Sequence, residues 1–364
     1  MRKAQRYTSV SRLALLVLVV AACGSPANVG PGATATSSPT SSSTTGSQTA
    51  AGSATTSATG VVTTQSPSTS APAYSACEPW QADSDRIEFA PHWEPGEAIQ
   101  LERTESRDRS GDSPDAGSST SMDVTVLESN SGGFVLSWEL GETIVDAGAI
   151  SFPDEDLLAE FLELAQIRFE YTTDPAGAYL GLRNLDEVRD RLGQAIDLLA
   201  ELPGMDPGVL EETRAVALSD QALQAGAAQD IVVYHSLYGR SLDVARPEVE
   251  ATLLTNLFGG EPFPATKTTK VITTRDNQGC VVVEVTETPD PERFVEILFD
   301  TLFPVGSEPS AEDRAEVESF QIVNKALFVY DYGSGRIRHV TAEQTTSTVS
   351  AFRTDVVTIV ETNR

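Results

Sequence analysis

The chain has 364 residues, of which 40% are hydrophobic and 21% charged, the composition of an ordinary globular protein. It carries 25 Lys and Arg against 53 Asp and Glu, a formal net charge of −28. Four basic residues precede position 23, so the remainder has 21 basic and 53 acidic groups and a net charge of −32. Such a surface repels phosphate, which argues against nucleic acid as a partner and against electrostatic docking on anionic lipid.

Residues 1–22 have the pattern of an export signal. A basic segment ends at Arg12, the apolar run 13–20 follows, and two alanines precede Cys23. The run is shorter than the roughly 20 residues that cross a bilayer, so we expect a signal peptide. The sequence Val-Ala-Ala-Cys resembles the lipobox of bacterial lipoproteins, whose cysteine is acylated before the leader is removed. The resemblance implies fatty acyl chains such as palmitate on Cys23, and a chain anchored in the cell membrane on its extracytoplasmic face. The alternative is an ordinary secretory leader with an incidental cysteine.

Residues 23–76 are expected to be the lipidated cysteine followed by a disordered tether. Positions 24–76 contain no charged side chain, and 25 of these 53 residues are Ser or Thr. Such a segment buries too little apolar surface to offset the entropy of ordering. We therefore expect a spacer, and its Ser, Thr and Pro content also permits O-glycosylation.

Residues 77–364 are expected to form a single extracytoplasmic domain with one disulfide. Only Cys77 and Cys280 remain after Cys23, and an even pair in an oxidising compartment is most simply bridged. The bridge would close a loop of about 200 residues, which a chain-entropy model equates with roughly 5 kcal/mol. The alternative is a pair of free, buried thiols.

The first half of this domain alternates apolar and polar residues in several segments, a pattern typical of half-buried strands. These segments are 97–106, 121–128, 134–138, 167–171 and 178–182. Helices are predicted from Pro153 onward, from Asn184 to Leu202 and, rich in alanine, over 207–235. Asn184 and Glu187 have the spacing of a capping box.

The second half follows a similar order. Strands are predicted at 266–275, 280–286, 320–330, 336–345 and 350–361. Asp290 followed by Pro291 is typical of a helix start, and a short helix capped by Ser310 comes next. A hairpin, a helix and a hairpin thus occur twice, which suggests two pseudo-repeats at about 86–204 and 246–364.

Strands joined by tight turns must pair antiparallel, because a parallel crossover needs a dozen or more residues. The apolar face of the resulting sheet must be covered by the helices. We therefore predict an α+β fold, a large curved antiparallel sheet with helices packed on one face. This arrangement loosely resembles the LolA and LppX/LprG envelope lipid carriers, in element type and compartment only. The resemblance implies an apolar ligand between sheet and helices.

The usual catalytic signatures are missing from the sequence, which contains no G-x-S-x-G, P-loop, H-E-x-x-H or G-x-G-x-x-G. An enzyme would need His92, His235 or His339 to converge with carboxylates, and each alone is more often structural. Asp108, Asp112 and Asp115 crowd the segment 107–117 and offer oxygen ligands to calcium, but their spacing is not that of an EF-hand. A solvated loop is the simpler interpretation. We expect no catalytic residue, no metal site and no cofactor.

Binding is the remaining function. The aromatic residues of the strands, among them Trp138, Phe169, Tyr171 and Phe328, fill a core or line a cavity for a lipid. We predict a non-catalytic envelope lipoprotein that binds or transfers an apolar ligand through these four side chains. The alternative is a structural or interaction lipoprotein that presents its acidic surface to another envelope protein; a hydrolase is the third possibility.

Overall fold

The computed structural model describes residues 76–80, 85–110, 116–145, 160, 163–164, 166–200, 207–224, 228–256, 261–276, 278–303 and 309–362. The predicted signal peptide, Cys23 and nearly all of the tether lie outside these residues, as do Asp112, Asp115 and most of the helix predicted after Pro153. All described residues belong to one compact unit.

The elements follow one another in an order dominated by strands. The strands are β1 (Arg86–Glu88), β2 (Ala98–Arg109), β3 (Ala116–Asn130), β4 (Gly133–Val145), β5 (Arg168–Thr173), β6 (Tyr179–Leu182), β7 (Ser241–Asp243), β8 (Glu248–Leu254), β9 (Phe263–Thr273), β10 (Val281–Pro289), β11 (Gln321–Asp331), β12 (Arg336–Ser347) and β13 (Phe352–Glu361). The helices are α3 (Leu185–Ala200), α4 (Pro207–Ala217), α5 (Asp220–Ala222), α6 (Gln229–His235), α7 (Pro291–Leu302) and α8 (Ala311–Ser319).

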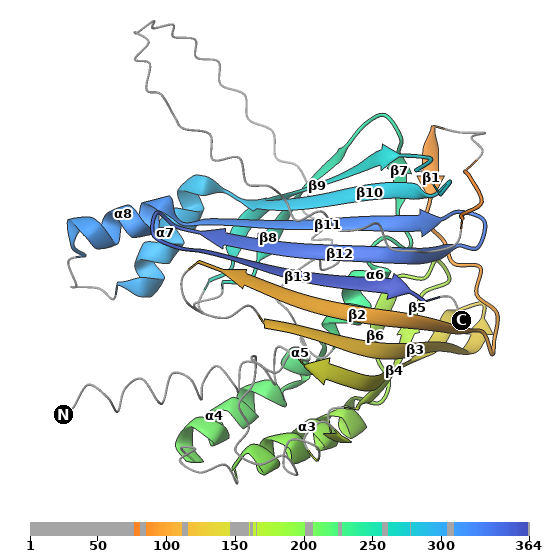
Figure 1. Ribbon diagram of the computed structural model, residues 1–364, viewed down its shortest axis with the longest axis horizontal. Helices are drawn as coiled ribbons and strands as arrows, with labels where there is room; N and C mark the ends of the chain where they lie inside the picture. The colour runs from red at the N-terminus through yellow and green to blue at the C-terminus, as the bar shows by residue number, and fades with distance from the viewer. Residues whose placement is uncertain are drawn as a thin grey trace, which may run out of the picture. The chain divides into compact units, whose positions relative to one another are not determined.

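Eleven of these strands form one antiparallel sheet, in the order β6-β5-β4-β3-β2-β13-β12-β11-β10-β9-β8. Neighbours in this order are mostly neighbours in the chain, as expected for strands joined by short turns. The two halves of the chain meet where β2 pairs with the last strand, β13, as Figure 1 shows near the middle of the sheet. β1 and β7 form a separate two-stranded sheet. The predicted α+β fold with a large curved antiparallel sheet is confirmed.

The helices contact a single face of this sheet. In α6, the ring of Tyr234 lies 5.6 Å from that of Trp138 on β4, and in α7 the ring of Phe294 lies 4.6 Å from that of Phe263 on β9. Helices α7 and α8 lie together at one end of the sheet in Figure 1, and α3 and α4 lie beyond β4. Within the described residues, no helix combines the length and the apolar character that crossing a bilayer requires.

Two predicted helix features differ from the structure. The stretch 207–235 divides into α4, α5 and α6. Ser219 is the N-cap of α5, where its side chain accepts a hydrogen bond from the backbone N–H of Ala222. At the start of α3 the side-chain oxygen of Asn184 accepts from the N–H of Glu170 on β5, while its amide nitrogen donates to Glu187. Asn184 therefore ties the helix to the sheet as well as reaching Glu187. The helix starts at Asp290 and Ser310 are confirmed.

The segment 107–117, predicted as a loop, is partly strand. β2 continues to Arg109, and β3 begins at Ala116. The ladder persists because Arg107 and Asp108 pair in register with Asp355 and Thr354 on β13. Partners on the neighbouring strand therefore outweigh the low strand propensity of this charged segment.

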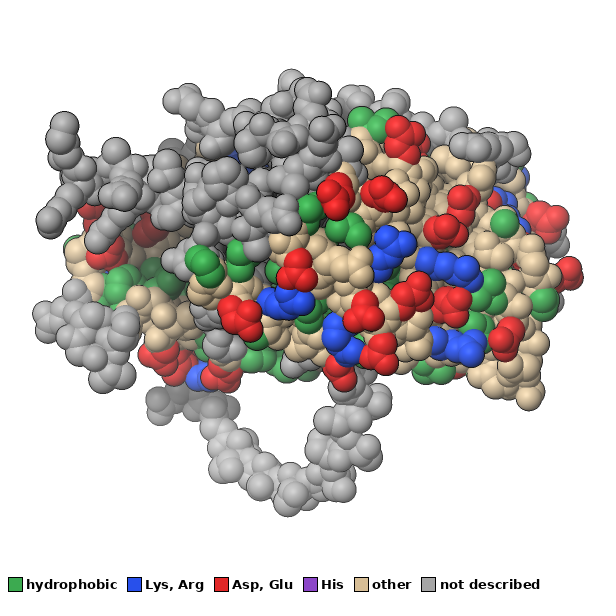
Figure 2. All heavy atoms as spheres, turned by 90° about the horizontal axis from the view of Figure 1, so that it is seen from below, with side chains coloured by type: hydrophobic (Ala, Val, Ile, Leu, Met, Phe, Trp, Pro, Cys, Tyr) green, Lys and Arg blue, Asp and Glu red, His purple; other side chains and the backbone are tan. Residues whose placement is uncertain are grey.

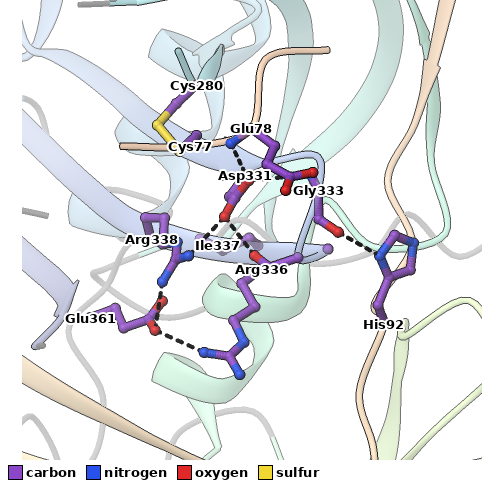
Figure 3. A network of polar contacts seen from close by, with 12 residues as sticks. Cys77, Glu78, His92, Cys280, Asp331, Gly333, Arg336, Ile337, Arg338 and Glu361 are labelled. Atoms are coloured by element: carbon purple, nitrogen blue, oxygen red, sulfur yellow. Dashed lines mark hydrogen bonds and ion pairs between the residues drawn. A yellow bond between two sulfur atoms is a disulfide. The ribbon is translucent and has the colours of Figure 1, made fainter. Parts of the chain in front are cut away.

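The predicted disulfide is present between Cys77 and Cys280, whose Cα atoms are 5.0 Å apart. Figure 3 shows the bridge beside a polar network at the β11–β12 turn. There Asp331 accepts hydrogen bonds from the backbone of Glu78 (3.1 Å) and from Arg338 (2.7 Å). Burial raises the pKa of Asp331, but hydrogen bonds from Ser334 and Arg338 outweigh it and hold the pKa below the usual value. The bridge and this carboxylate together fasten the start of the domain to the sheet.

Candidate functional site

The four aromatic residues predicted to bind a ligand are all buried in one apolar cluster on the helix-covered face, here called the main cluster. Trp138 and Phe169 are direct partners on β4 and β5, and Tyr171 lies two residues further along β5. Phe328 belongs to β11, from which β4 is separated by four strands. The fold therefore brings three of the four side chains together and places Phe328 in another part of the same cluster. Their role in ligand binding stays a prediction.

His235, the last residue of α6, lies within this cluster and uses both ring nitrogens. Nδ1 lies 2.8 Å from the carbonyl oxygen of Gly177, which can only accept, so Nδ1 carries the proton. Nε2 then accepts from the hydroxyl of Tyr171 at 2.9 Å. The rings of Trp93 and Tyr238 each lie 5.5 Å from the imidazole. Burial lowers the pKa of His235 to about 4, so the ring is neutral and fully engaged at physiological pH.

The other candidate residues have separate surroundings. His92 is exposed, and its Nδ1 lies 3.0 Å from the carbonyl oxygen of Gly333. His339 on β12 contacts the hydroxyl of Thr341 at 2.8 Å, and burial lowers its pKa to about 4. Asp108 belongs to β2. Over the part of the chain that the structure describes, no three His, Cys, Asp or Glu side chains are grouped so as to hold a metal ion.

A row of polar residues crosses seven adjacent strands of the sheet. Each member is the direct register partner of the next, from β8 at the edge to β2 near the middle. The row, here called the polar row, consists of Glu250, Lys267, Glu287, Asn324, Gln344, Asp355 and Arg107. Its five central members are between 1% and 6% exposed. Buried polar side chains in such number need an explanation, because each must replace its lost water contacts.

The polar row divides the apolar surface of this face. Along β11, Ile322 precedes Asn324 and belongs to a second apolar cluster, here called the small cluster, which α7 and α8 cover. Ala326 and Phe328 follow Asn324 on the same face and belong to the main cluster. The same arrangement occurs on β9, where Ala265 belongs to the small cluster and comes before Lys267 of the polar row. Apolar surface therefore flanks the row on both sides.

The contacts of Glu287 with its neighbours in the row are long, at 4.0 Å and 3.4 Å. Nζ of Lys267 is 3.9 Å from Oε1 of Glu250 and 4.0 Å from Oε1 of Glu287. Asn324 donates to Oε2 of Glu287 at 3.4 Å and accepts from Gln344 at 3.0 Å. Oε1 of Glu287 and the hydroxyl of nearby Thr269, both 1% exposed, have no hydrogen-bond partner among the described residues.

Burial shifts both ionisable groups here toward their neutral forms. It raises the pKa of Glu287, and the nearby Lys267 offsets this only in part. It lowers the pKa of Lys267, although Glu287 counteracts the shift. Desolvation therefore exceeds the mutual attraction of the pair, as expected when a buried lysine and carboxylate lie 4 Å apart.

The inner part of the row is tightly paired. Asp355 accepts from Arg107 at 2.5 Å and lies 2.6 Å from Nε of Arg353. Four residues before Arg107 and on the same face of β2, Arg103 contacts Asp230 of α6 at 2.7 Å and Glu105 at 3.1 Å. Burial lowers the pKa of Arg103, but these two carboxylates outweigh it and raise the pKa above its ordinary value. This end of the row fastens α6 to the sheet.

The sequence held a signal for the polar row. In β9, Phe263, Ala265, Lys267 and Thr269 occupy alternate positions, and so share a face. A lysine at that parity marks a polar position on the buried face. The cross-strand alignment of seven such positions depends on the register, which turn lengths and bulges set and which single strands do not display.

Figure 2 shows one face of the molecule, on which acidic, basic and apolar side chains are interspersed. Elsewhere among the described residues, exposed carboxylates also have basic partners, such as Asp220 with Arg189 at 2.6 Å and Glu296 with Arg293 at 2.5 Å. The face in Figure 2 carries both signs of charge.

Comparison with known proteins gives little. No family model matches the chain, and no curated protein sequence matches it. A solved structure described as showing lipid–protein interactions in lipovitellin is similar over 76% of this chain, with 9% identity and a TM-score of 0.38. The match spans 26% of that much longer chain. A likeness at this level carries no argument about function.

Proposed function

We propose that the chain is a lipid-anchored, non-catalytic lipoprotein of the bacterial cell envelope that binds an apolar or amphiphilic molecule. The anchor rests on the export pattern of residues 1–22 and on the Val-Ala-Ala-Cys sequence that ends at Cys23. The uncharged segment 24–76 then gives the domain reach from the membrane surface on its extracytoplasmic side.

One observation carries the ligand: a buried polar row lies between two apolar clusters on the helix-covered face. An amphiphile presents the same division, because its head group needs hydrogen-bond partners and its acyl chain needs apolar surface. Glu287 and Thr269 supply buried polar atoms that no described residue satisfies. The head group would bind there, and the chain would lie against one of the two clusters.

The engagement of His235 supports a non-catalytic role. Both of its ring nitrogens are used within the core, and its lowered pKa leaves it neutral across the physiological range. A general acid or base needs a titratable group near the operating pH and within reach of a substrate. The pKa of His235 lies well below the operating pH, so it does not meet the first condition.

The proposal is tested in a bacterial host supplied with a palmitate analogue that carries an alkyne and a photoactivatable diazirine. Irradiated and dark cells are compared, and the full-length protein is digested and its labelled peptides identified. We expect light-independent label on the peptide that begins at Cys23, and light-dependent label on peptides from β9 to β11. Cys23→Ser should abolish the first signal.

Two matched double variants replace a lysine–glutamate pair by apolar residues, one on each face of the sheet. Lys267→Met with Glu287→Leu replaces a register pair on the buried face, and Lys270→Met with Glu284→Leu replaces one on the opposite face. We expect only the first double variant to lose the light-dependent label. Label confined to the Cys23 peptide would support the anchor and refute the ligand; equal loss in both variants would refute the polar row as the head-group site.

A further inference from the structure

The sheet ends at β8 with an open edge. β8 is the outermost strand of the sheet among the described residues, next to β9. Its register pairs Leu253 with Pro264, and the carbonyl oxygen of Pro264 accepts from the N–H of Asp290, beyond β10. The polar backbone groups of Pro264 therefore point away from β8. It follows that Leu253 is not hydrogen-bonded to Pro264 and directs its own N–H and C=O away from the sheet.

The alternation of an antiparallel ladder extends this assignment along the strand. No bulge interrupts the β8–β9 register, so Val249 and Ala251 also direct their N–H and C=O outward. The side chains of Val249 and Leu253 are 65% and 58% exposed. Among the described residues, no hydrogen-bond partner meets these outward backbone groups. An edge of this kind with exposed apolar side chains is a template for another strand.

The opposite edge of the sheet lacks this property. At β6 the side chain of Gln224 accepts hydrogen bonds from the N–H of Leu182 (3.2 Å) and from the hydroxyl of Tyr179 (3.0 Å). A side chain thus occupies an edge donor of β6. The two ends of the sheet differ, and β8 is the one available for pairing.

We propose that two copies of this chain pair through β8, antiparallel and about a two-fold axis at Ala251, so that their sheets become continuous. Val249 of each copy then lies opposite Leu253 of the other, and the outward N–H and C=O groups of both residues and of Ala251 are hydrogen-bonded. The exposed apolar side chains cover one another on a common face.

Charge favours this register over its neighbours. It places Glu250 opposite Thr252 and Glu248 opposite Leu254, so no like charges face each other. A slip by two residues in one direction sets Glu250 opposite Glu250 of the second copy, which is repulsive. A slip in the other direction leaves Val249 beyond the end of the opposing strand. The carboxylate of Glu248 is already paired with Arg240 of its own chain at 3.1 Å.

Cysteine substitutions in the full-length chain, exported in bacteria and treated with a mild oxidant, test the proposal. Ala251→Cys faces itself across the two-fold axis at a Cα separation of about 5.5 Å, within the range of a disulfide. We expect a reducible species of twice the chain mass. Val249→Cys, on the same strand and well exposed, is the matched control, because the two copies of this residue would be about 14 Å apart. It should stay monomeric alone and crosslink when co-expressed with Leu253→Cys.

Ala251→Pro adds a test by disruption. Because the N–H of Ala251 points outward, proline there removes an edge donor without breaking the ladder to β9. Placed in both co-expressed chains, it should abolish the crosslink between Val249→Cys and Leu253→Cys. The proposal is overturned if Ala251→Cys remains monomeric or if Val249→Cys alone dimerises equally well. A crosslinked product whose mass is not twice that of the chain would also overturn it, because another protein would then be bound to the edge.

Discussion

Each face of β10 carries a glutamate with a lysine as its neighbour on β9, and the two pairs differ in how closely the charged groups approach. On the face turned away from the helices, Glu284 contacts Lys270 at 2.6 Å and Lys325 at 2.7 Å. On the covered face, Glu287 is 4.0 Å from Lys267, and one of its oxygens has no hydrogen bond from a described residue. Lys270 and Lys267 are the direct register partners of Glu284 and Glu287 on β9, so pairing geometry alone does not account for the difference.

The comparison shows what burial demands of a charge. A partly exposed pair gains little from close contact, because water screens it. A buried pair loses hydration and needs close, complete contacts to recover the cost. Here the buried pair is the loosely paired one, and the pKa of Glu287 is raised while that of Glu284 is lowered. The unsatisfied oxygen of Glu287, buried inside the folded core, is therefore a candidate for an external partner.

The largest difference between the faces is expected on removing one lysine. Lys267→Met leaves Glu287 buried without its nearby cation and should cost about 3–5 kcal/mol of unfolding free energy at pH 7.5. Lys270→Met, on the exposed side, should cost under about 1 kcal/mol. Denaturant titrations of the two variants measure both values. Equal losses would remove the distinction between the faces.

The same variant has a defined pH dependence. A carboxyl whose folded pKa is raised above its unfolded value destabilises the fold at pH values above that folded pKa, and the penalty disappears as the pH falls and the group is protonated in both states. The difference between wild type and Lys267→Met should therefore shrink between pH 7.5 and pH 4. A difference that widens on acidification would contradict a raised pKa of Glu287.

His235 shows how burial affects a polar group whose hydrogen bonds are complete, again through the pH dependence of stability. Its pKa is lowered to about 4, so the folded state resists protonation that the unfolded state accepts below about pH 6.5. The wild type should lose roughly 3 kcal/mol through this group as the pH falls from 6.5 to 4. His235→Gln, which cannot titrate, should lack that component. Parallel stability–pH curves for the two proteins would show that His235 is not the group responsible.

The fold was largely predictable from the sequence, whereas the polar row was not. Alternating segments such as 134–138 and 167–171 predicted strands because a half-buried strand repeats every two residues, and Asp290 with Pro291 predicted the start of α7 because its cap is local. The polar row needs seven strands in correct register, which is a property of the whole sheet. The halves of the sheet meet through β2 and β13, more than 240 residues apart, and no local pattern reports that pairing.

Replacing both members of the buried pair should have a smaller effect than removing one. Lys267→Met with Glu287→Leu eliminates two desolvated charges, so the unfolding free energy should stay within about 1 kcal/mol of wild type or rise by up to about 2 kcal/mol. Thermal and denaturant unfolding measure this directly. A loss of several kcal/mol would mean that the pair stabilises the fold itself, and the case for an external partner would fail.

The smallest effect is expected at Glu284. Glu284→Gln keeps the shape of the side chain and removes the charge that Lys270 and Lys325 share, at a cost of under about 1 kcal/mol. Hydrogen bonds from these two lysines lower the pKa of Glu284, so its contribution is present above the unfolded pKa and is lost as the pH falls through the folded value. The difference between wild type and Glu284→Gln should accordingly vanish at low pH and shrink in high salt, because salt screens exposed pairs far more than buried ones. The opposite result would be a stability difference for Glu284→Gln that salt does not change, together with one for Lys267→Met that salt reduces. It would show that solvent screens the covered pair and not the pair on the other face.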